Sequence, residues 1–251
     1  MATLNEYNAC GEDLERLLLL RTSPIAVKML EKEEDIPEGA IRPKRDRGIH
    51  IAQCQAFAMS RRDRLSIAML KEDNWCFAPL IAYGLVEKPD DPTIVSEHLV
   101  SFPRLEKGKY IGIVSAPLKT ANFEPDLVLI YSNTAQLRTM LMPSHWMGKE
   151  AVVNCHFYPP SCAYTVVPVL TDGQFVTALP DPGDYERALA GADEIILSVP
   201  KRKIIPLTAG LRGLDERKQG YTSSNYMMQA NFPRPEFYKK LFKNWGLDVE
   251  P

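Results

Sequence analysis

The chain has 251 residues, of which 45% are hydrophobic and 25% are charged, which is enough to bury one large core or two small ones. Its 30 basic and 32 acidic side chains leave a net charge of −2, so no general basic field exists to hold nucleic acid or an anionic membrane. The apolar runs have strand length, short of a signal peptide or of the ~20 residues that span a bilayer. We therefore expect a single compact domain over residues 1–251, located in the cytoplasm.

Hydrophobic spacing predicts helices and strands in the first half of the chain. Apolar residues recur every three to four positions in the predicted helices, and β-branched residues are enriched in the predicted strands. The helices are expected at residues 4–21, 49–59, 78–83 and 93–107, and the strands at 24–30, 65–70 and 109–118. The charged residues 31–48 between them are typical of a solvated loop.

The second half continues the mixture of strands and helices. Residues 125–133 are almost continuously apolar, as strands buried on both faces tend to be, and Asn133 or Thr134 can cap a helix that reaches Met142. Further strands are expected at 174–180 and 193–200. An amphipathic helix, EFYKKLFKNW, lies in a C-terminal extension over residues 216–251. The pattern predicts an α/β (or α+β) fold with a mixed sheet flanked by helices.

Four of the five cysteines stand in segments that could converge: Cys54, Cys76, Cys155 and Cys162. In a cytosolic chain of this size, cysteines are more often thiols, metal ligands or catalytic groups than a disulfide framework. Cys76 stands at a strand-to-helix junction, where exposed backbone amides favour a thiolate. Two prolines between Cys155 and Cys162 force a bend that can bring both sulfurs to a common point.

Three interpretations of these cysteines stay open. Thiolates from distant segments could hold a [4Fe-4S] cluster, and an iron without a protein ligand would act as a Lewis acid on a small-molecule substrate. The cysteines could instead be small buried residues of a cofactor-free binding or accessory protein. Alternatively, Cys155 or Cys162 could be a nucleophile activated by His156. No spacing matches the CxxC pairs of a zinc ribbon, so spacing does not choose among them.

Two histidines are candidate catalytic groups. His156 follows Cys155 directly and could act as a general base or as an alternative ligand. His50 precedes Cys54 by four residues and would share its face if both lie on one helix. Both histidines could equally be ordinary structural residues.

A basic cluster, Arg61, Arg62 and Arg64, follows the predicted helix at 49–59. Guanidinium groups bind carboxylates or phosphates through paired hydrogen bonds, so Arg61 and Arg62 are candidate substrate-binding residues. The alternative is a solvated helix end. The later segment LPDPGDYE could form a turn near the site through Asp181, Gly183 and Asp184, or a plain Gly/Pro turn. No Walker loop, GxGxxG, GxSxG or HExxH is present.

Several segments, taken together, resemble one protein family. They are RTSPIAVKML, CQAFAMSRRDR, WCFAPLIAYGL, PDLVLIYSNTAQ, SCAYTVVP, LPDPGDYERA and DEIILSVP. In order and spacing they resemble the archaeal-conserved-region family, domain of unknown function 169, over roughly residues 12 to 215. That family is named for lacking an assigned function, and its members look like soluble proteins of archaea and anaerobic bacteria.

The resemblance singles out three of the cysteines. The family pattern has cysteines at positions matching Cys54, Cys76 and Cys162, which implies that these three form the functional set. Related sequences tend to carry small residues where this chain has Cys155, and Tyr185 stands where the family has Arg, which puts any role of that Arg in doubt here.

We therefore expect an oxygen-sensitive [4Fe-4S] enzyme with lyase-type or hydrolytic chemistry on a small organic acid or thio compound. Its ligands would be Cys54, Cys76 and Cys162, with the fourth iron site open or closed by Cys155. A homo-oligomer is compatible with the sequence.

Overall fold

The computed structural model describes residues 2–91, 93–94, 96–148, 154–223 and 234–247. At its centre is a seven-stranded sheet in the order β2-β3-β1-β4-β7-β6-β5. Neighbouring strands are antiparallel, except for the parallel pair of β5 and β6. The strands are β1 Ile25–Leu30, β2 Ile67–Leu70, β3 Gly112–Pro117, β4 Leu127–Ser132, β5 Cys155–His156, β6 Val176–Ala178 and β7 Ile195–Pro200. The predicted α/β fold with a mixed sheet is confirmed.

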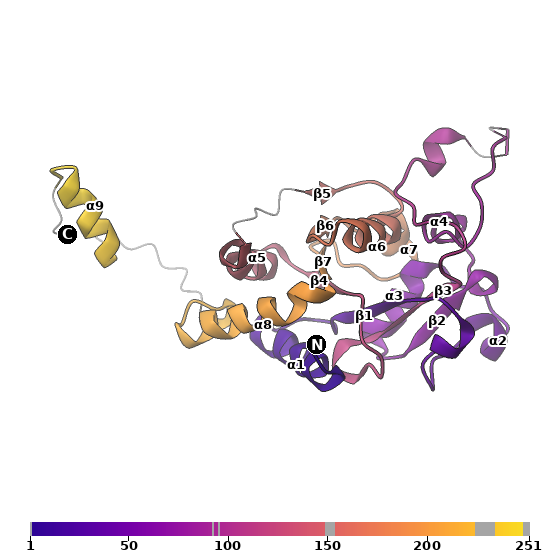
Figure 1. The fold of residues 1–251 in the computed structure, drawn as a ribbon, viewed down its shortest axis with the longest axis horizontal. Coiled ribbons are helices and arrows are strands. Elements are labelled where there is room, and N and C mark those ends of the chain that lie inside the picture. The colour runs from indigo at the N-terminus through magenta and orange to yellow at the C-terminus, as the bar shows by residue number, and fades with distance from the viewer. Residues whose placement is uncertain (1, 92, 95, 149–153, 224–233, 248–251) are drawn as a thin grey trace.

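The helices of the described residues cover both faces of this sheet or follow it along the chain (Figure 1). They are α1 Leu4–Leu18, α2 Pro43–Arg47, α3 Gln53–Arg62, α4 Phe77–Ala82, α5 Thr134–Gly148, α6 Ser161–Asp172, α7 Pro182–Arg187, α8 Lys201–Glu216 and α9 Glu236–Asn244. Local chemistry explains several starts: Thr3 caps α1 in a capping box, and α7 begins with an Asp181 cap and a proline in its first turn.

Side-chain alternation along the strands builds two cores, one on each face. Ala26 and Leu30 of β1 join the core under α1, α5 and α8, whereas Ile25, Val27 and Met29 join the core under α3, α4 and α6. Successive strand residues point to opposite faces, so one apolar strand serves both cores. The result is a three-layer arrangement with the sheet in the middle (Figure 1).

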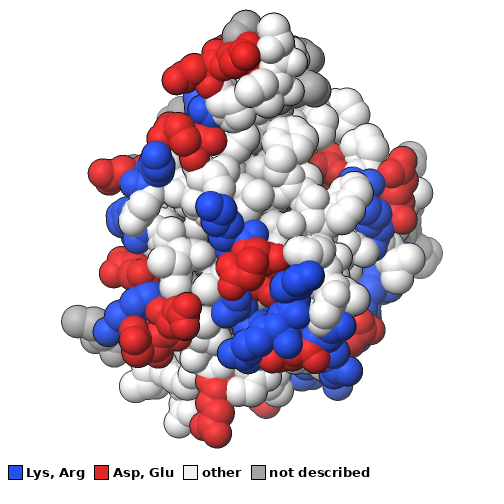
Figure 2. Space-filling model, turned by 90° about the vertical axis from the view of Figure 1, so that its right-hand side faces the viewer, with Lys and Arg blue, Asp and Glu red and all other residues white. Residues whose placement is uncertain are grey.

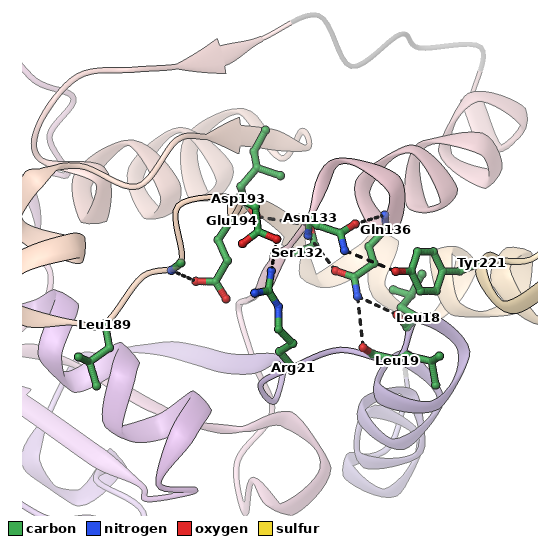
Figure 3. Close-up of polar contacts among 12 residues, drawn as sticks. Leu18, Leu19, Arg21, Ser132, Asn133, Gln136, Leu189, Asp193, Glu194 and Tyr221 are labelled. Carbon is green, nitrogen blue, oxygen red and sulfur yellow. Dashed lines mark hydrogen bonds and ion pairs between the residues drawn. The ribbon is translucent and has the colours of Figure 1, made fainter. Parts of the chain in front are cut away.

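Hydrogen bonds tie the C-terminal end of α1 to the start of α5 (Figure 3). Leu19 ends α1 in the left-handed conformation. The side-chain amide of Gln136 donates to the carbonyls of Leu18 at 2.9 Å and Leu19 at 3.2 Å. Asn133 and Gln136 each donate a backbone N–H to the other's side-chain oxygen at 2.8 Å. These bonds satisfy carbonyls that a helix end leaves without intrahelical partners.

The predicted helix at 93–107 is wrong for the described part of that range. Only Glu97–Val100 is helical there, as a short 3₁₀ turn. Pro103 explains the early stop, because proline lacks an amide donor and disfavours helical geometry in the residue before it.

Four helices, α2, α6, α7 and α8, were not predicted, and α6 and α8 are the longest of them. The sequence of α6 is rich in valine and threonine and includes Pro168, and α8 includes Pro206 and two glycines. These residues lower intrinsic helix propensity. Both helices nevertheless bury an apolar face against the sheet, and this burial outweighs the propensity.

The surface carries both signs of charge. On the face drawn in Figure 2, the Lys and Arg side chains are interspersed with Asp and Glu. The predicted amphipathic helix of the C-terminal extension is present as α9, which carries exposed apolar side chains, Phe237 and Leu241 among them. No helix in the described ranges has the length and apolar character needed to cross a membrane.

Candidate functional site

Three helix starts bring three cysteines to one side of the sheet. Cys54 is the second residue of α3, Cys76 is the N-cap of α4, and Cys162 is the second residue of α6. These helices cover the same sheet face, and α4 contacts α6. Burial raises the pKa of the Cys162 thiol well above its usual value, and the charges of Cys54 and Cys76 raise it further. Cys54 and Cys76 therefore both lie within electrostatic range of Cys162.

The two more buried thiols hold their protons strongly. The pKa of Cys54 is raised to about 12, first by burial and then by the nearby carboxylates of Asp184 and Asp181, while Arg187 opposes the rise. Desolvation disfavours a thiolate in the same way at Cys162. In the absence of a bound cation, Cys54 and Cys162 are therefore neutral thiols at neutral pH.

A carboxylate pair at the start of α7 adjoins the thiols. Asp181 accepts hydrogen bonds from the backbone N–H groups of Gly183 at 2.6 Å, Asp184 at 3.1 Å and Ser161 at 2.7 Å. Asp184 accepts from the backbone N–H of Asp181 at 3.0 Å and from the Ser161 hydroxyl at 2.5 Å. The hydroxyl of Tyr131 lies 3.4 Å from the other oxygen of Asp184. The two aspartates thus join the first turns of α6 and α7.

Asp184 is a buried carboxyl with an altered proton affinity. Its residue is only 1% exposed. Its pKa is raised to about 6, first by burial and then by the charge of Asp181, and the hydrogen bond from Ser161 opposes the rise. A carboxyl of this kind can exchange a proton near neutral pH.

Two further contacts close the group of four helices. The Cys54 Sγ lies 3.8 Å from the carbonyl oxygen of Gly183 on α7. The hydroxyl of the fully buried Tyr83, directly after α4, donates to the carbonyl of Cys162 at 3.0 Å. Gln53, the residue before Cys54, is 1% exposed, and its amide nitrogen and oxygen have no partner among the described residues. Such groups commonly meet water or a bound group.

A cavity of about 650 Å³ opens beside the thiols. Cys76 and Gly183 both line it, and Gly183 is the residue whose carbonyl contacts Cys54. Its other lining residues are Phe77, Ala78, Ser101, Phe102, Tyr158, Pro159, Pro160, Tyr164, Asp181, Pro182 and Arg187. We name this cavity the thiol pocket. Its walls are mainly aromatic and prolyl, with a few polar groups, which is typical of small-molecule sites.

The structure separates Cys155 from the three converging thiols. Cys155 lies on β5, opposite Thr177 of β6, and is exposed. The His156 ring stacks on Tyr164 with ring centroids 4.9 Å apart. Neighbouring strand residues point to opposite faces, so His156 is directed away from the Cys155 side chain and toward a residue that lines the thiol pocket. The predicted bend between Cys155 and Cys162 is present, but it places the two on different elements.

The predicted helical pairing of His50 with Cys54 is wrong. α3 begins at Gln53, and His50 is exposed in the segment before it. Ile51 pairs with the backbone around Asn74 there in a short β-bridge, which holds the segment extended. His50 therefore does not share a helix face with Cys54.

The two predicted substrate-binding arginines lie at the C-terminal end of α3 and bind the loop after α7. Arg61 is buried, forms a 3.1 Å ion pair with Glu194 and lies 4.0 Å above the Tyr131 ring. Arg62 donates to the carbonyl of Leu189. The alternative of a solvated helix end is wrong for Arg61, and the substrate role of both residues stays a prediction.

Sequence reasoning missed several residues of the site. Ser161 and Tyr83 lie in apolar segments where nothing marks them as polar contacts. The sequence indicates a turn at Asp181, Gly183 and Asp184, and the structure shows this segment as the start of α7, next to Cys54. Its signal is the Asp-Pro-x-Asp order, in which an N-cap aspartate precedes a proline at the first helical position.

No group of three or more His, Cys, Asp or Glu side chains in the described residues is arranged to hold a metal ion.

The match to known sequences covers most of the chain. A family model named DUF169 and described as "Uncharacterised ArCR" matches residues 13–210. The protein MJ0308 of Methanocaldococcus jannaschii, described as uncharacterized, is 22% identical over 218 residues, which is 80% of this chain and 91% of that protein. No solved structure matches. The chain therefore belongs to the DUF169 family.

Proposed function

We propose that Cys54, Cys76 and Cys162 bind a [4Fe-4S] cluster, and that the thiol pocket presents a small organic acid or thio compound to it for lyase-type or hydrolytic chemistry. The observation that carries the proposal is that three cysteines stand at three separate helix starts on one face of the sheet, and that one of them, Cys76, lines the thiol pocket. In a cluster each cysteine binds a different iron, so the thiols need not surround a single ion.

The electrostatics of the site suit cluster ligands. The raised pKa values of Cys54 and Cys162 are caused first by burial, and both residues would lose these protons on ligating iron, because thiolates, not thiols, are the ligands. Both residues lie in the first turn of a helix, where the positive end of the helix dipole favours the thiolate. The two helix starts therefore favour the thiolate form that cluster binding requires.

Three protein ligands would leave one iron for the substrate. Cys155, the candidate fourth ligand, is exposed on β5, which favours an open iron site over a fully cysteine-ligated one. An open iron supplies Lewis-acid chemistry toward a hydroxyl, thiol or carboxylate. Asp184 is a buried carboxyl whose pKa, raised to about 6, suits a proton donor or acceptor for that chemistry.

The direct test is the iron, zinc and acid-labile sulfide content, with an absorption spectrum, of protein prepared without oxygen. We expect iron and sulfide near four atoms each per chain, as [4Fe-4S] requires, and a broad visible band. Cys54→Ser, Cys76→Ser and Cys162→Ser should each lose the cluster. Cys10→Ser is the matched control, because Cys10 is buried in the core on the other face of the sheet. Full retention of iron and sulfide in all three site variants would overturn the proposal.

A second candidate is a cofactor-free protein that binds a small molecule in the thiol pocket. The neutral, buried state of Cys54 and Cys162 favours it, because such thiols are inert without a metal. The same property argues against Cys162 as a nucleophile. Metal-free protein that still binds a ligand in the pocket would support this candidate in place of the cluster.

A further inference from the structure

Aromatic rings form much of the wall of the thiol pocket. Phe77, Phe102, Tyr158 and Tyr164 all line it. Phe102 is buried, whereas Tyr158 is 68% exposed and stands at the surface. Stacked or edge-to-face contacts with such rings favour a flat aromatic guest over an aliphatic one. The volume of about 650 Å³ lies within the range of ordinary small-molecule sites.

One arginine supplies the cationic group of this pocket. Arg187, at the end of α7, lines the cavity and lies 5.2 Å above the Trp75 ring. Its ion pair with the adjacent Glu186, at 3.2 Å, uses a single nitrogen, and the side chain is 37% exposed. The guanidinium fork matches a carboxylate through two parallel hydrogen bonds. Arg187 therefore retains donors for an anion in the pocket.

The acidic residue of the pocket does not cancel this cation. Asp181 also lines the cavity, but its two oxygens already accept from the backbone N–H groups of Gly183, Asp184 and Ser161. Those donors occupy both oxygens of Asp181, so this carboxylate does not compete for the remaining donors of Arg187. The guanidinium therefore stays available to a carboxylate ligand.

We propose that the thiol pocket binds an aromatic carboxylate, with its ring between Phe77, Phe102 and the tyrosines and its carboxylate on Arg187. The inference rests on the proposed function, since it names the substrate class for the pocket that adjoins the cluster ligand Cys76. It narrows the small organic acid to one that carries an aromatic ring.

The test measures binding of phenylacetate to the full chain, prepared without oxygen, by isothermal titration calorimetry. Phenylacetamide lacks the charge and acetate lacks the ring, so each should bind at least tenfold more weakly. Arg187→Gln should weaken phenylacetate binding by about 10- to 100-fold, the usual range for loss of a charged, paired hydrogen bond. Tyr158→Leu, at an exposed position, should weaken it several-fold.

Arg45→Gln is the matched control. Arg45 is also an exposed arginine paired with the adjacent acidic residue, Asp46, at 2.6 Å, and it lies outside the pocket. The affinity of the Arg45→Gln variant for phenylacetate should stay within twofold of that of the parent. Equal affinity of Arg187→Gln and parent, or of phenylacetamide and phenylacetate, would overturn the inference.

The iron and sulfide content of the same samples separates the two proposals. Iron and sulfide without any binding of phenylacetate would overturn this inference and leave the proposed cluster intact. Phenylacetate binding that depends on Arg187, in protein without iron or sulfide, would support the aromatic-carboxylate site and overturn the cluster.

Discussion

The Ser161 hydroxyl donates a hydrogen bond of 2.5 Å to the buried carboxylate of Asp184. Ser161 is the first residue of α6, directly before Cys162, and Asp184 lies in the first turn of α7, directly after Gly183. Because the Gly183 carbonyl contacts Cys54, this bond links the positions of two of the three thiols. The turn from Asp181 to Asp184 therefore positions Cys54 and Cys162 relative to each other.

Removing that hydroxyl should destabilise the protein. Ser161→Ala leaves the buried Asp184 without one donor, which costs about 1–3 kcal/mol of unfolding free energy. Ser96→Ala is the control, since Ser96 is exposed and its side chain makes no cap hydrogen bond, and it should change stability by no more than about 0.5 kcal/mol. Urea unfolding measures both. If Ser161→Ala is as stable as the parent, this hydrogen bond does not stabilise the site.

The buried Asp184 carboxyl should make stability fall between pH 4 and pH 7. Its pKa in the folded state is raised, first by burial, from 3.8 to about 6. The folded state therefore binds the proton more tightly than the unfolded state, so the contribution is complete below pH 3.8 and is lost as the pH rises through 6. The loss is about 3 kcal/mol at most, from about two pKa units at 1.36 kcal/mol each.

Comparison of unfolding free energies at pH 4 and pH 7 tests this contribution. Asp184→Asn should show a smaller loss of stability between the two pH values than the parent does. Asp46→Asn is the control, because the hydrogen bond from Arg45 lowers the pKa of Asp46 to about 2, so its titration lies below this window. If Asp184→Asn keeps the full pH dependence of the parent, another group is responsible.

Gly183 should resist substitution although its backbone is ordinary. A Cβ there would lie 2.9 Å from the Asp181 carboxylate oxygen and 2.5 Å from an Arg187 nitrogen. Gly183→Ala should therefore disturb the α7 cap and cost about 1–2 kcal/mol of stability. In Gly213→Ala, the nearest atom is 3.6 Å away inside α8, and the change should stabilise by about 0.4–1 kcal/mol. Thermal unfolding of both variants should give opposite signs, and equal signs would contradict this explanation.

Sequence patterns predicted the strands of the sheet better than the helices that pack on it. The apolar runs that became β1, β4 and β7 carry their own signal, because burial on both faces demands apolar residues throughout. The helix α6 has no such signal, since its valines and Pro168 favour other structures and only packing on the sheet makes it helical.

The sequence also does not predict that Cys155 and Cys162 lie apart. The pair Pro159 and Pro160 predicts a bend, but not the direction in which each cysteine leaves it. Likewise, the adjacent arginines Arg61 and Arg62 predict a basic helix end. It does not reveal that Arg61 turns inward to Glu194, which stands 133 positions away in the chain.

Thiol labelling of metal-free protein should separate the cysteines by exposure. Cys155 is exposed and should react first with a disulfide reagent at neutral pH. Cys54 and Cys162 should react slowly, because burial raises the pKa of both thiols. Cys155→Ser should remove the fast phase, whereas Cys10→Ser, at a buried position, should leave it unchanged. A fast phase that persists in Cys155→Ser would point to a reactive thiol in the pocket.

Arg61 should matter for stability far more than its neighbour. Arg61→Met leaves Glu194 buried without its ion-pair partner and removes the cation above Tyr131, which should cost about 3–5 kcal/mol. Arg62→Ala, at an exposed position, should cost about 0.5 kcal/mol or less. The double variant Arg61→Met with Glu194→Gln should recover part of the loss, because no unpaired charge remains. Urea unfolding of the three variants decides this, and a double variant no more stable than Arg61→Met would assign the loss to packing instead of charge.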